Sequence, residues 1–289
     1  MKYATTIKEQ IQLLKDRNMI ISDEAKAEEI LFDVGYYRLG FYWFPFEECN
    51  KSNNRKHTFK PNTKFEDIIK LYYFDQDLRN CIAKYLFRIE IDFRTNLVYT
   101  VSNHYKNNPI WFADDRCVTR KFIESKFQDI YDNIKSKYAV IKKHHDKYRN
   151  DRYAPAWKTI EFMTFGEICI LYSNLIDKKL KQEIASRYGI ENVKIFTKYL
   201  HVIRILRNQC AHGRNIYDIN IDQSIQKTEY INIRNEHKHN INGILQVVFY
   251  ILHHISENRE KELKECLKDL IDRNYSIKDI LRPFNELSL

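Results

Sequence analysis

Residues 65–105 read FEDIIKLYYFDQDLRNCIAKYLFRIEIDFRTNLVYTVSNHY. Apolar side chains recur in this stretch every three or four residues, which is typical of the buried face of an amphipathic α-helix. They are Ile68, Leu71, Tyr72, Leu78, Ile82, Tyr85, Leu86, Ile89, Phe93 and Leu97. Just before them, Thr63 and Glu66 have the spacing of a capping box, in which two side chains satisfy backbone groups at a helix start. The sequence therefore predicts one long helix from Phe65 to about Tyr105.

The composition of the whole chain also favours helices. The 289 residues include 6 Gly and 5 Pro, whereas an average protein of this length has about 20 and about 15. Sharp turns are therefore few, and we predict an all-α helical bundle. We assign an N-terminal helical, aromatic-rich region to residues 1–62 and a larger helical domain to residues 63–289. The alternative is one continuous domain.

Other local patterns predict shorter elements around the long helix. Residues 35–46 read GYYRLGFYWFPF, and such a density of rings predicts burial in the core. The remaining helix signals are an apolar repeat at residues 7–14, capping residues 22–24 before a helix to about Val34, a helical pattern over residues 118–149, a capping box at Thr164 and Glu167, and Gly189 at a C-cap position.

The charge balance suggests an anionic partner. The chain has 48 basic and 39 acidic residues, a net charge of +9, together with 20 Tyr and 17 Phe. Basic and aromatic side chains together are typical of RNA binding, although a lysine-rich solvated surface explains the same numbers. The lysine-rich residues 118–149 have the same two interpretations, which are a basic helix face that lies along RNA and an ordinary solvated surface. The RNA-binding candidates are Lys142, Lys143, Arg149 and Arg214.

Several classes of protein are disfavoured. The six cysteines are widely separated and form no Cys-x-x-Cys pair, which argues against a zinc site and a redox dithiol. The N-terminus lacks an apolar signal core, and the longest apolar run, residues 244–252, is shorter than the roughly 20 residues that span a bilayer. We therefore expect a cytoplasmic protein with reduced thiols, no membrane partner, no metal and no cofactor.

A second apolar stripe leads into a polar motif. Val193, Phe196, Leu200 and Ile203 follow helical spacing, and the next positions of the stripe are Arg207 and Cys210. Arg207 is therefore predicted to point toward buried or interfacial space. A guanidinium group there is unfavourable unless it is paired, so one interpretation is a structural ion pair.

The motif itself reads Arg207-Asn208-Gln209-Cys210-Ala211-His212. Cleavage of RNA beside a 2′-hydroxyl needs a proton acceptor, a proton donor and positive charge near the phosphorus. Histidine provides the proton transfers at neutral pH, and arginine provides a permanent charge with a planar fork for phosphate oxygens. The pair of Arg207 and His212 therefore indicates metal-independent RNA cleavage.

Helix geometry constrains how this pair can act. Five residues turn about 500°, so in an unbroken helix His212 lies roughly 140° around the axis from Arg207. The two side chains converge on one phosphate only if the helix ends, for which Gly213 is suited, or if a second copy contributes. Two chains related by a two-fold axis would place two cations, an acid and a base in one cleft.

Four blocks of the chain resemble the Abi-like family, the AbiD/AbiF type of bacterial abortive-infection protein. They are residues 35–39 (GYYRL), residues 87–91 (FRIEI), Trp157 through Phe165-Gly166 with residues 171–175 (LYSNL), and residues 207–212 (RNQCAH). The resemblance implies a HEPN-type helical bundle with additional N-terminal helices. It also implies a growth-arresting toxin that cuts RNA without metal, usually as a homodimer, with a small noncoding RNA as a possible antitoxin.

In this resemblance Arg207 and His212 are the catalytic pair and Asn208 orients the site. Many members of the family have a second histidine after the catalytic one, where this chain has Gly213. Residues 234–239 (RNEHKH) repeat the motif spacing, so Arg234 and His239 are either part of a second half-site or a loop or cap. The alternative function is a non-catalytic RNA-binding or interaction scaffold in which Arg207 pairs with phosphate or carboxylate.

Overall fold

A computed structural model describes residues 3–48, 57–287 and 289 of the chain. Helices dominate these ranges, and isolated bridges are the only β-type pairing in them, which confirms the all-α class. The α-helices are α1 (Ile7–Asp16), α2 (Glu24–Asp33), α3 (Tyr36–Leu39), α4 (Phe65–His104), α5 (Arg120–Phe122), α6 (Gln128–Lys137), α7 (Ala139–Lys147), α8 (Ala156–Thr159), α9 (Phe165–Asn174), α10 (Lys178–Ser186), α11 (Val193–Ala211), α12 (Ile241–Ile255), α13 (Glu257–Arg273) and α14 (Arg282–Asn285). The 3₁₀ turns are η1 (Phe44–Phe46), η2 (Trp111–Ala113), η4 (Ile160–Phe162), η5 (Asn235–His237) and η6 (Tyr275–Ile277), and η3 (Ile123–Phe127) is a π-helix.

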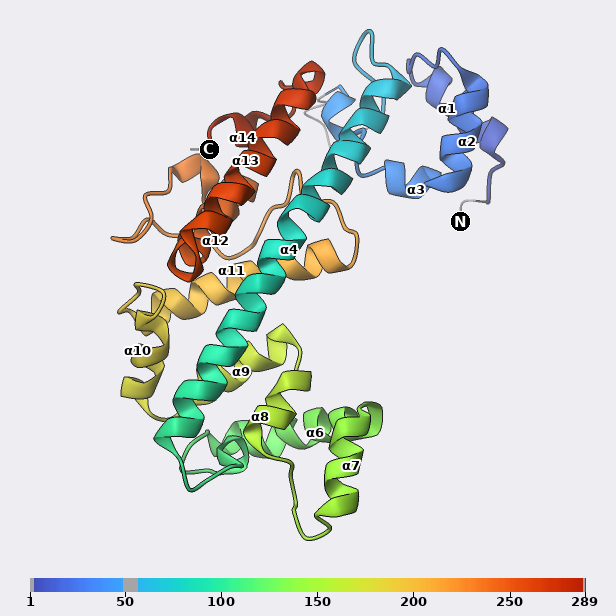
Figure 1. Cartoon of the computed structure of the whole chain (residues 1–289). Helices are drawn as coiled ribbons and strands as arrows, with labels where there is room; N and C mark the ends of the chain where they lie inside the picture. Colours follow the sequence, from blue (N-terminus) through green and yellow to red (C-terminus); the bar gives the residue numbers. More distant parts are fainter. Residues whose placement is uncertain (1–2, 49–56, 288) are drawn as a thin grey trace.

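The predicted long helix is α4, which has 40 residues and a length of about 60 Å at 1.5 Å per residue. It runs the length of the molecule (Figure 1). The helices α1–α3 lie at its N-terminal end, α6–α8 lie near its C-terminal end, and α11 crosses it near the middle (Figure 1). Helices α9 to α13 all contact α4, so α4 is the axis on which the other helices are arranged.

The start of α4 differs from the predicted capping box. Lys64, not Thr63, is the N-cap residue, and no side chain caps the helix. Thr63 Oγ1 instead donates to the carbonyl oxygen of Lys60 at 2.8 Å. Backbone hydrogen bonds of Ile20 with Thr63 and Phe65 hold Lys64 extended. The helix therefore begins one residue later than the capping box requires, and that prediction is wrong.

Aromatic packing joins α4 to the helix that carries the motif. Phe93 of α4 makes edge-to-face contacts with Phe165 and Tyr172 of α9 and with Phe196 of α11. All four side chains are buried. Such ring pairs contribute about 0.5–1.5 kcal/mol each beyond the area they bury. The stripe that begins at Val193 thus packs on α4 as its spacing predicts, with Phe196, Leu200 and Ile203 buried.

A buried carboxylate of α4 holds the segment that follows α11. The side chain of Asp75 is fully buried and forms an ion pair with Arg79. It also accepts hydrogen bonds from the backbone amides of Ile216 and Tyr217, at 2.9 and 2.7 Å, and from the Tyr42 hydroxyl at 2.8 Å. Burial raises the pKa of Asp75, and the Arg79 charge opposes that shift. One side chain therefore links α4, the aromatic segment (residues 35–46) and the segment just after α11 (residues 213–218), which we call the post-motif segment.

The aromatic segment at residues 35–46 is only partly buried. Tyr42 and Trp43 belong to the core, as predicted, but Tyr37, Phe41 and Phe44 are 83%, 47% and 57% exposed. The prediction of a wholly buried block is wrong, because α3 is a short helix at the surface with one side on the core. Buried residues of the N-terminal helices and of the rest of the chain form one hydrophobic cluster.

The remaining local predictions have mixed outcomes. The capping box of Thr164 and Glu167 is present at the start of α9, and Gly189 has a φ of +66° just after α10. The single helix expected over residues 118–149 is instead divided into α5, η3, α6 and α7. Tyr138 lies between α6 and α7. Its extended φ and ψ angles end α6.

The cysteines also depart from expectation. Cys81 of α4 and Cys266 of α13 form a disulfide, so the expectation of reduced thiols is wrong for this pair. Cys117, Cys169 and Cys210 are free, and Cys49 lies outside the described residues. Among the described helices, none combines the length and the apolar character needed to cross a bilayer.

Replacing Asp75 with Ala should lower the free energy of unfolding by about 3–5 kcal/mol, because it leaves Arg79 buried without its counter-ion. Two backbone amides would also lose their acceptor. Urea denaturation measures the change. Asp77→Ala, at an exposed position of the same helix, is the control and should change stability by at most about 0.5 kcal/mol. Equal effects of the two variants would contradict the linking role of Asp75.

Candidate functional site

The motif forms the last turn of α11. The helix ends at Ala211, His212 is its C-cap residue, and Gly213 has a φ of +61°. The amide of Gly213 bonds back to Cys210 and that of Arg214 to Gln209, at 3.2 and 3.0 Å. A positive φ favours glycine, so Gly213 ends the helix where the sequence suggested a stop. Arg207 and His212 therefore lie on the last turns of one helix.

Arg207 is held by an ion pair with α4. Its Nε donates to Glu90 Oε2 at 3.0 Å, and its guanidinium group lies 5.5 Å from the centroid of the Phe87 ring. The side chain is 24% exposed, which agrees with the predicted interfacial position. Neither terminal nitrogen of Arg207 has a hydrogen bond within the described ranges. The guanidinium group is thus fixed through one edge and open at the other.

Glu90 is shared between two arginines. Its side chain is 8% exposed, and Arg94 Nη2 donates to Oε1 at 3.0 Å while Arg207 binds Oε2. Arg94 also donates to the backbone oxygen of Met163 at 3.0 Å. Glu90 and Arg94 thus form an i,i+4 ion pair within α4. The contact of Glu90 with Arg207 was not predicted, although Phe87 and Glu90 both belong to a block quoted above.

His212 faces a different part of the molecule. It is exposed, and its ring makes no hydrogen bond to any residue that the structure describes. Together with Tyr37, Arg38 and Phe41 it lines a cavity of about 530 Å³. Arg38 Nη1 donates to the backbone oxygen of Gly213 at 2.9 Å, so the cavity wall is tied to the motif. The imidazole is therefore accessible to a ligand in this cavity.

The catalytic candidates thus have different neighbours within one chain. Arg207 contacts Glu90 and Phe87 of α4, whereas His212 lines the cavity beside α3. Asn208 is exposed, and its side chain makes no hydrogen bond within the described part of the chain. This divergence agrees with the angular separation expected from helix geometry.

The free thiols near the motif, Cys169 and Cys210, have raised pKa values. Burial raises the pKa of Cys210 to about 12 and that of Cys169 to about 12. Both thiols therefore stay protonated near neutral pH, and only the thiolate is reactive.

Burial, and then the charge of Arg204, lower the pKa of His201. Arg204 Nη2 lies 2.9 Å from the Nδ1 atom of His201.

The repeated motif at residues 234–239 has structural contacts. Arg234 Nη1 lies 3.3 Å from Glu286 Oε2, and His239 Nδ1 lies 2.8 Å from the backbone oxygen of Ile221. His237 Nε2 lies 2.8 Å from the same Glu286 oxygen. Ligand atoms of Glu236, His237 and Glu286 lie within 4.8 Å of one another and could hold a cation. The Arg234 charge already neutralises Glu286, which weakens that possibility.

The RNA-binding candidates lie in two places. Lys142 and Lys143 are exposed on α7, and Arg149 is exposed just after it. Helix α7 lies far from α3, toward the opposite end of α4 (Figure 1). Arg214 is exposed in the segment after His212 and lines the same cavity. The structure therefore brings Arg214, but not the other three residues, next to the motif.

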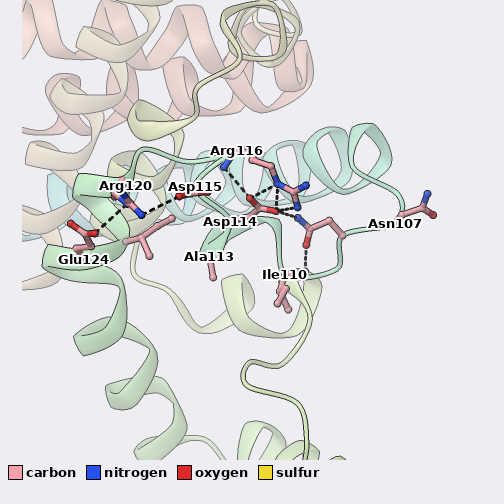
Figure 2. A pocket seen from close by; sticks show the side chains of 10 residues that line it. Asn107, Ile110, Ala113, Asp114, Asp115, Arg116, Arg120 and Glu124 are labelled. Carbon is pink, nitrogen blue, oxygen red and sulfur yellow. Dashed lines mark hydrogen bonds and ion pairs between the residues drawn. The ribbon is translucent and has the colours of Figure 1, made fainter.

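A larger cavity, of about 690 Å³, lies in the loop and short helices after α4 (Figure 2). Its wall consists largely of ion pairs, with Arg116 bonded to Asp114 and Arg120 placed between Asp115 and Glu124. The hydrogen bonds from Arg116 are the main reason that the pKa of Asp114 is lowered to about 2. The cavity contains no motif residue, and its charged groups already neutralise one another. The motif is therefore the better functional candidate.

Comparisons with known proteins point to the same region. The family model of the Abi-like protein matches residues 29–218, which include α3, α4 and the motif. Reticulocyte-binding protein homolog 1 of Plasmodium falciparum (isolate 3D7) is 26% identical over 299 residues. That match covers 100% of this chain but 9% of the other protein, so the chain spans a small part of that relative. No solved structure matches the chain.

Proposed function

Because this chain belongs to the Abi-like protein family, we propose that it is a metal-independent HEPN endoribonuclease acting as a growth-arresting toxin in abortive infection. The observation that carries the proposal is an exposed imidazole at His212 and a half-open guanidinium group at Arg207 on one helix end. The substrate is RNA, the place of action is the cytoplasm, and a small noncoding RNA is the proposed restraint.

The proposed chemistry uses only groups of this site. His212 takes the proton of the RNA 2′-hydroxyl or protonates the leaving 5′-oxygen, the two roles that histidine most often has in general acid–base catalysis. The terminal nitrogens of Arg207 bind the oxygens on which negative charge develops. Attack of the 2′-oxygen on phosphorus breaks the bond to the 5′-oxygen and gives a 2′,3′-cyclic phosphate.

Glu90 has a positioning role in this proposal. It binds the Nε edge of Arg207 and leaves the terminal nitrogens for substrate. Arg94, on the other oxygen of Glu90, limits how far the carboxylate can move. Fixed orientation matters because a preorganised charge stabilises a transition state without further rearrangement.

A homodimer would complete the site. One chain supplies one motif imidazole, whereas the reaction uses both a base and an acid, and Arg207 and His212 face different neighbours. Beside Arg207, α4 exposes Phe87 and Ile91, which are 44% and 51% accessible and four residues apart on one face. Exposed apolar patches often mark protein interfaces. We place the dimer contact on this face of α4.

The second candidate function is a non-catalytic RNA-binding or interaction scaffold. The ion pair between Arg207 and Glu90 favours it, because a paired guanidinium group needs no catalytic explanation. The two functions predict opposite results in one assay. Purified protein is incubated with transfer RNA in EDTA, and the fragments are tested for 2′,3′-cyclic phosphate ends. Absence of cutting would support the scaffold.

His212→Ala should slow cleavage by about 10²–10⁴-fold, because it removes the proton-transfer group. Thermal unfolding should be unchanged, since the exposed ring has no partner within the described ranges. His239→Ala, an exposed histidine in the repeated motif, is the matched control and should retain full activity. If His239→Ala instead lost cleavage while His212→Ala stayed active, the catalytic site would have to be assigned to residues 234–239.

Arg207→Lys should lower the cleavage rate by about 10²-fold, because an ammonium group lacks the planar fork that binds two phosphate oxygens in a fixed orientation. Arg204→Lys, one turn earlier on α11, changes the same residue type outside the proposed site and should leave the rate unchanged. Single-turnover kinetics provide the comparison. Full activity of Arg207→Lys would contradict phosphate binding by the guanidinium group.

Light scattering should give twice the chain mass of 35.1 kDa. Ile91→Glu should produce monomers and abolish cleavage, because it puts a charge into the proposed apolar contact. Ile176→Glu changes an isoleucine of similar exposure, 47%, which lies between α9 and α10 and outside the proposed contact, and should leave the dimer intact. A wild-type monomer that cuts RNA would overturn the dimeric site.

A further inference from the structure

Two adjoining cavities flank α3 next to His212. The cavity of about 530 Å³ that contains His212 shares Tyr37, Phe41 and Asn215 with a second cavity of about 440 Å³. The second cavity is also lined by Phe44 and Asp218. We call the two cavities together the aromatic cleft. Its residues come from the aromatic segment on one side and from the post-motif segment on the other.

The rings of the aromatic cleft are exposed. Tyr37 is 83% exposed, and its ring packs edge-to-face with Phe41 at 5.5 Å between centroids. Phe41 is 47% exposed. Leaving rings in water forgoes about 25 cal/mol per Å² of apolar surface that burial would provide. A cluster of exposed rings beside the exposed imidazole of His212 therefore indicates a surface that a ligand covers.

The cleft is also held in shape before any ligand arrives. Arg38 binds the backbone oxygen of Gly213, and the Tyr217 hydroxyl donates to the backbone oxygen of Phe41 at 3.1 Å. Asp75 binds Tyr42 and the amide of Tyr217 from below. The two walls are thus tied together at several points. A ligand that stacks there loses little affinity to reordering of the protein.

The polar wall suggests which ligand fits. Asp218 lines the second cavity of the cleft, and its Oδ1 accepts a hydrogen bond from Asn215 Nδ2 at 2.6 Å. A carboxylate accepts hydrogen bonds and donates none. Arg38 and Arg214 line the adjoining cavity that contains His212 and favour a polyanion. Flat rings, an acceptor edge and nearby cations together match an unstacked base of single-stranded RNA.

We propose that the aromatic cleft binds a guanine base of the RNA strand adjacent to the scissile phosphate. Guanine presents two neighbouring N–H donors on its Watson–Crick edge, which one carboxylate can accept together. Tyr37 stacks on the base, Phe41 contacts the base edge-on because its ring is nearly perpendicular to that of Tyr37, and Asp218 reads the Watson–Crick edge. The location beside His212 makes this base the one that selects where the strand is cut. Binding of the base rests on the proposed RNA substrate alone, and its role in selecting the cut rests on the proposed nuclease.

The experiment uses RNA that cannot be cut. Fluorescein-labelled 2′-O-methyl oligouridines that carry a single G, A or C are titrated with wild-type protein, and binding is followed by fluorescence anisotropy. Methylation blocks the attacking hydroxyl, so the readout is binding alone. The oligonucleotide with G should bind about tenfold more tightly than the others, as expected when one base gains a bidentate contact.

Tyr37→Ala should weaken binding by about tenfold, because a stacked ring is lost. Asp218→Asn should remove the preference for G while leaving the other oligonucleotides bound as before, because an amide presents a donor in place of one acceptor. Tyr99→Ala is the matched control. Tyr99 is a 71% exposed tyrosine on α4, near the end of that helix opposite to α3 and outside the cleft.

The outcomes separate this inference from the nuclease proposal. Tyr37→Ala that binds as Tyr99→Ala does, with no preference for G, would overturn the guanine cleft even if wild-type protein cuts RNA. Selective loss of binding in Tyr37→Ala would support the cleft even if wild-type protein never cuts RNA. A Tyr37→Ala variant that turns monomeric while RNA binding stays unchanged would show that a second copy covers the rings, and would also overturn the inference.

Discussion

The buried carboxylate of Asp75 is the constraint on which the region around the motif depends. A carboxylate in the interior is unfavourable unless its oxygens are fully bonded, and this one is bonded by Arg79, the Tyr42 hydroxyl and two amides of the segment after α11. These partners come from three places in the chain, which are the next turn of α4, the aromatic segment and the segment after α11. Satisfying one charge therefore fixes how three segments meet.

Glu90 repeats the arrangement further along α4. Asp75 holds the segment that follows His212, and Glu90 holds Arg207 before it, so two acidic residues of one helix fix the two ends of the motif. The scaffold for both is a rigid 40-residue helix. Function placed on such a scaffold keeps its geometry better than function placed on loops alone.

Periodicity was enough to predict α4, the stripe of α11 and the interfacial position of Arg207, because these follow from spacing along one helix. Periodicity could not predict the partners of Asp75 and Glu90, because most of these partners come from other parts of the chain. Asp75 lies on the apolar stripe of α4, which signals burial, but spacing says nothing about a partner 142 residues away. The exposed rings of the aromatic segment were predicted to be buried for a related reason. Composition shows that this segment has many rings, but it does not show which of them face the core.

The links between Arg38, Tyr42 and the post-motif segment have a consequence for where the chain can be divided. A hydroxyl from residues 1–62 completes the shell of Asp75, and a guanidinium group from the same region binds Gly213. A protein shortened to begin at residue 63 would expose that carboxylate to water and release the turn beside His212. Residues 1–62 and residues 63–289 are therefore expected to unfold together, as a single cooperative unit.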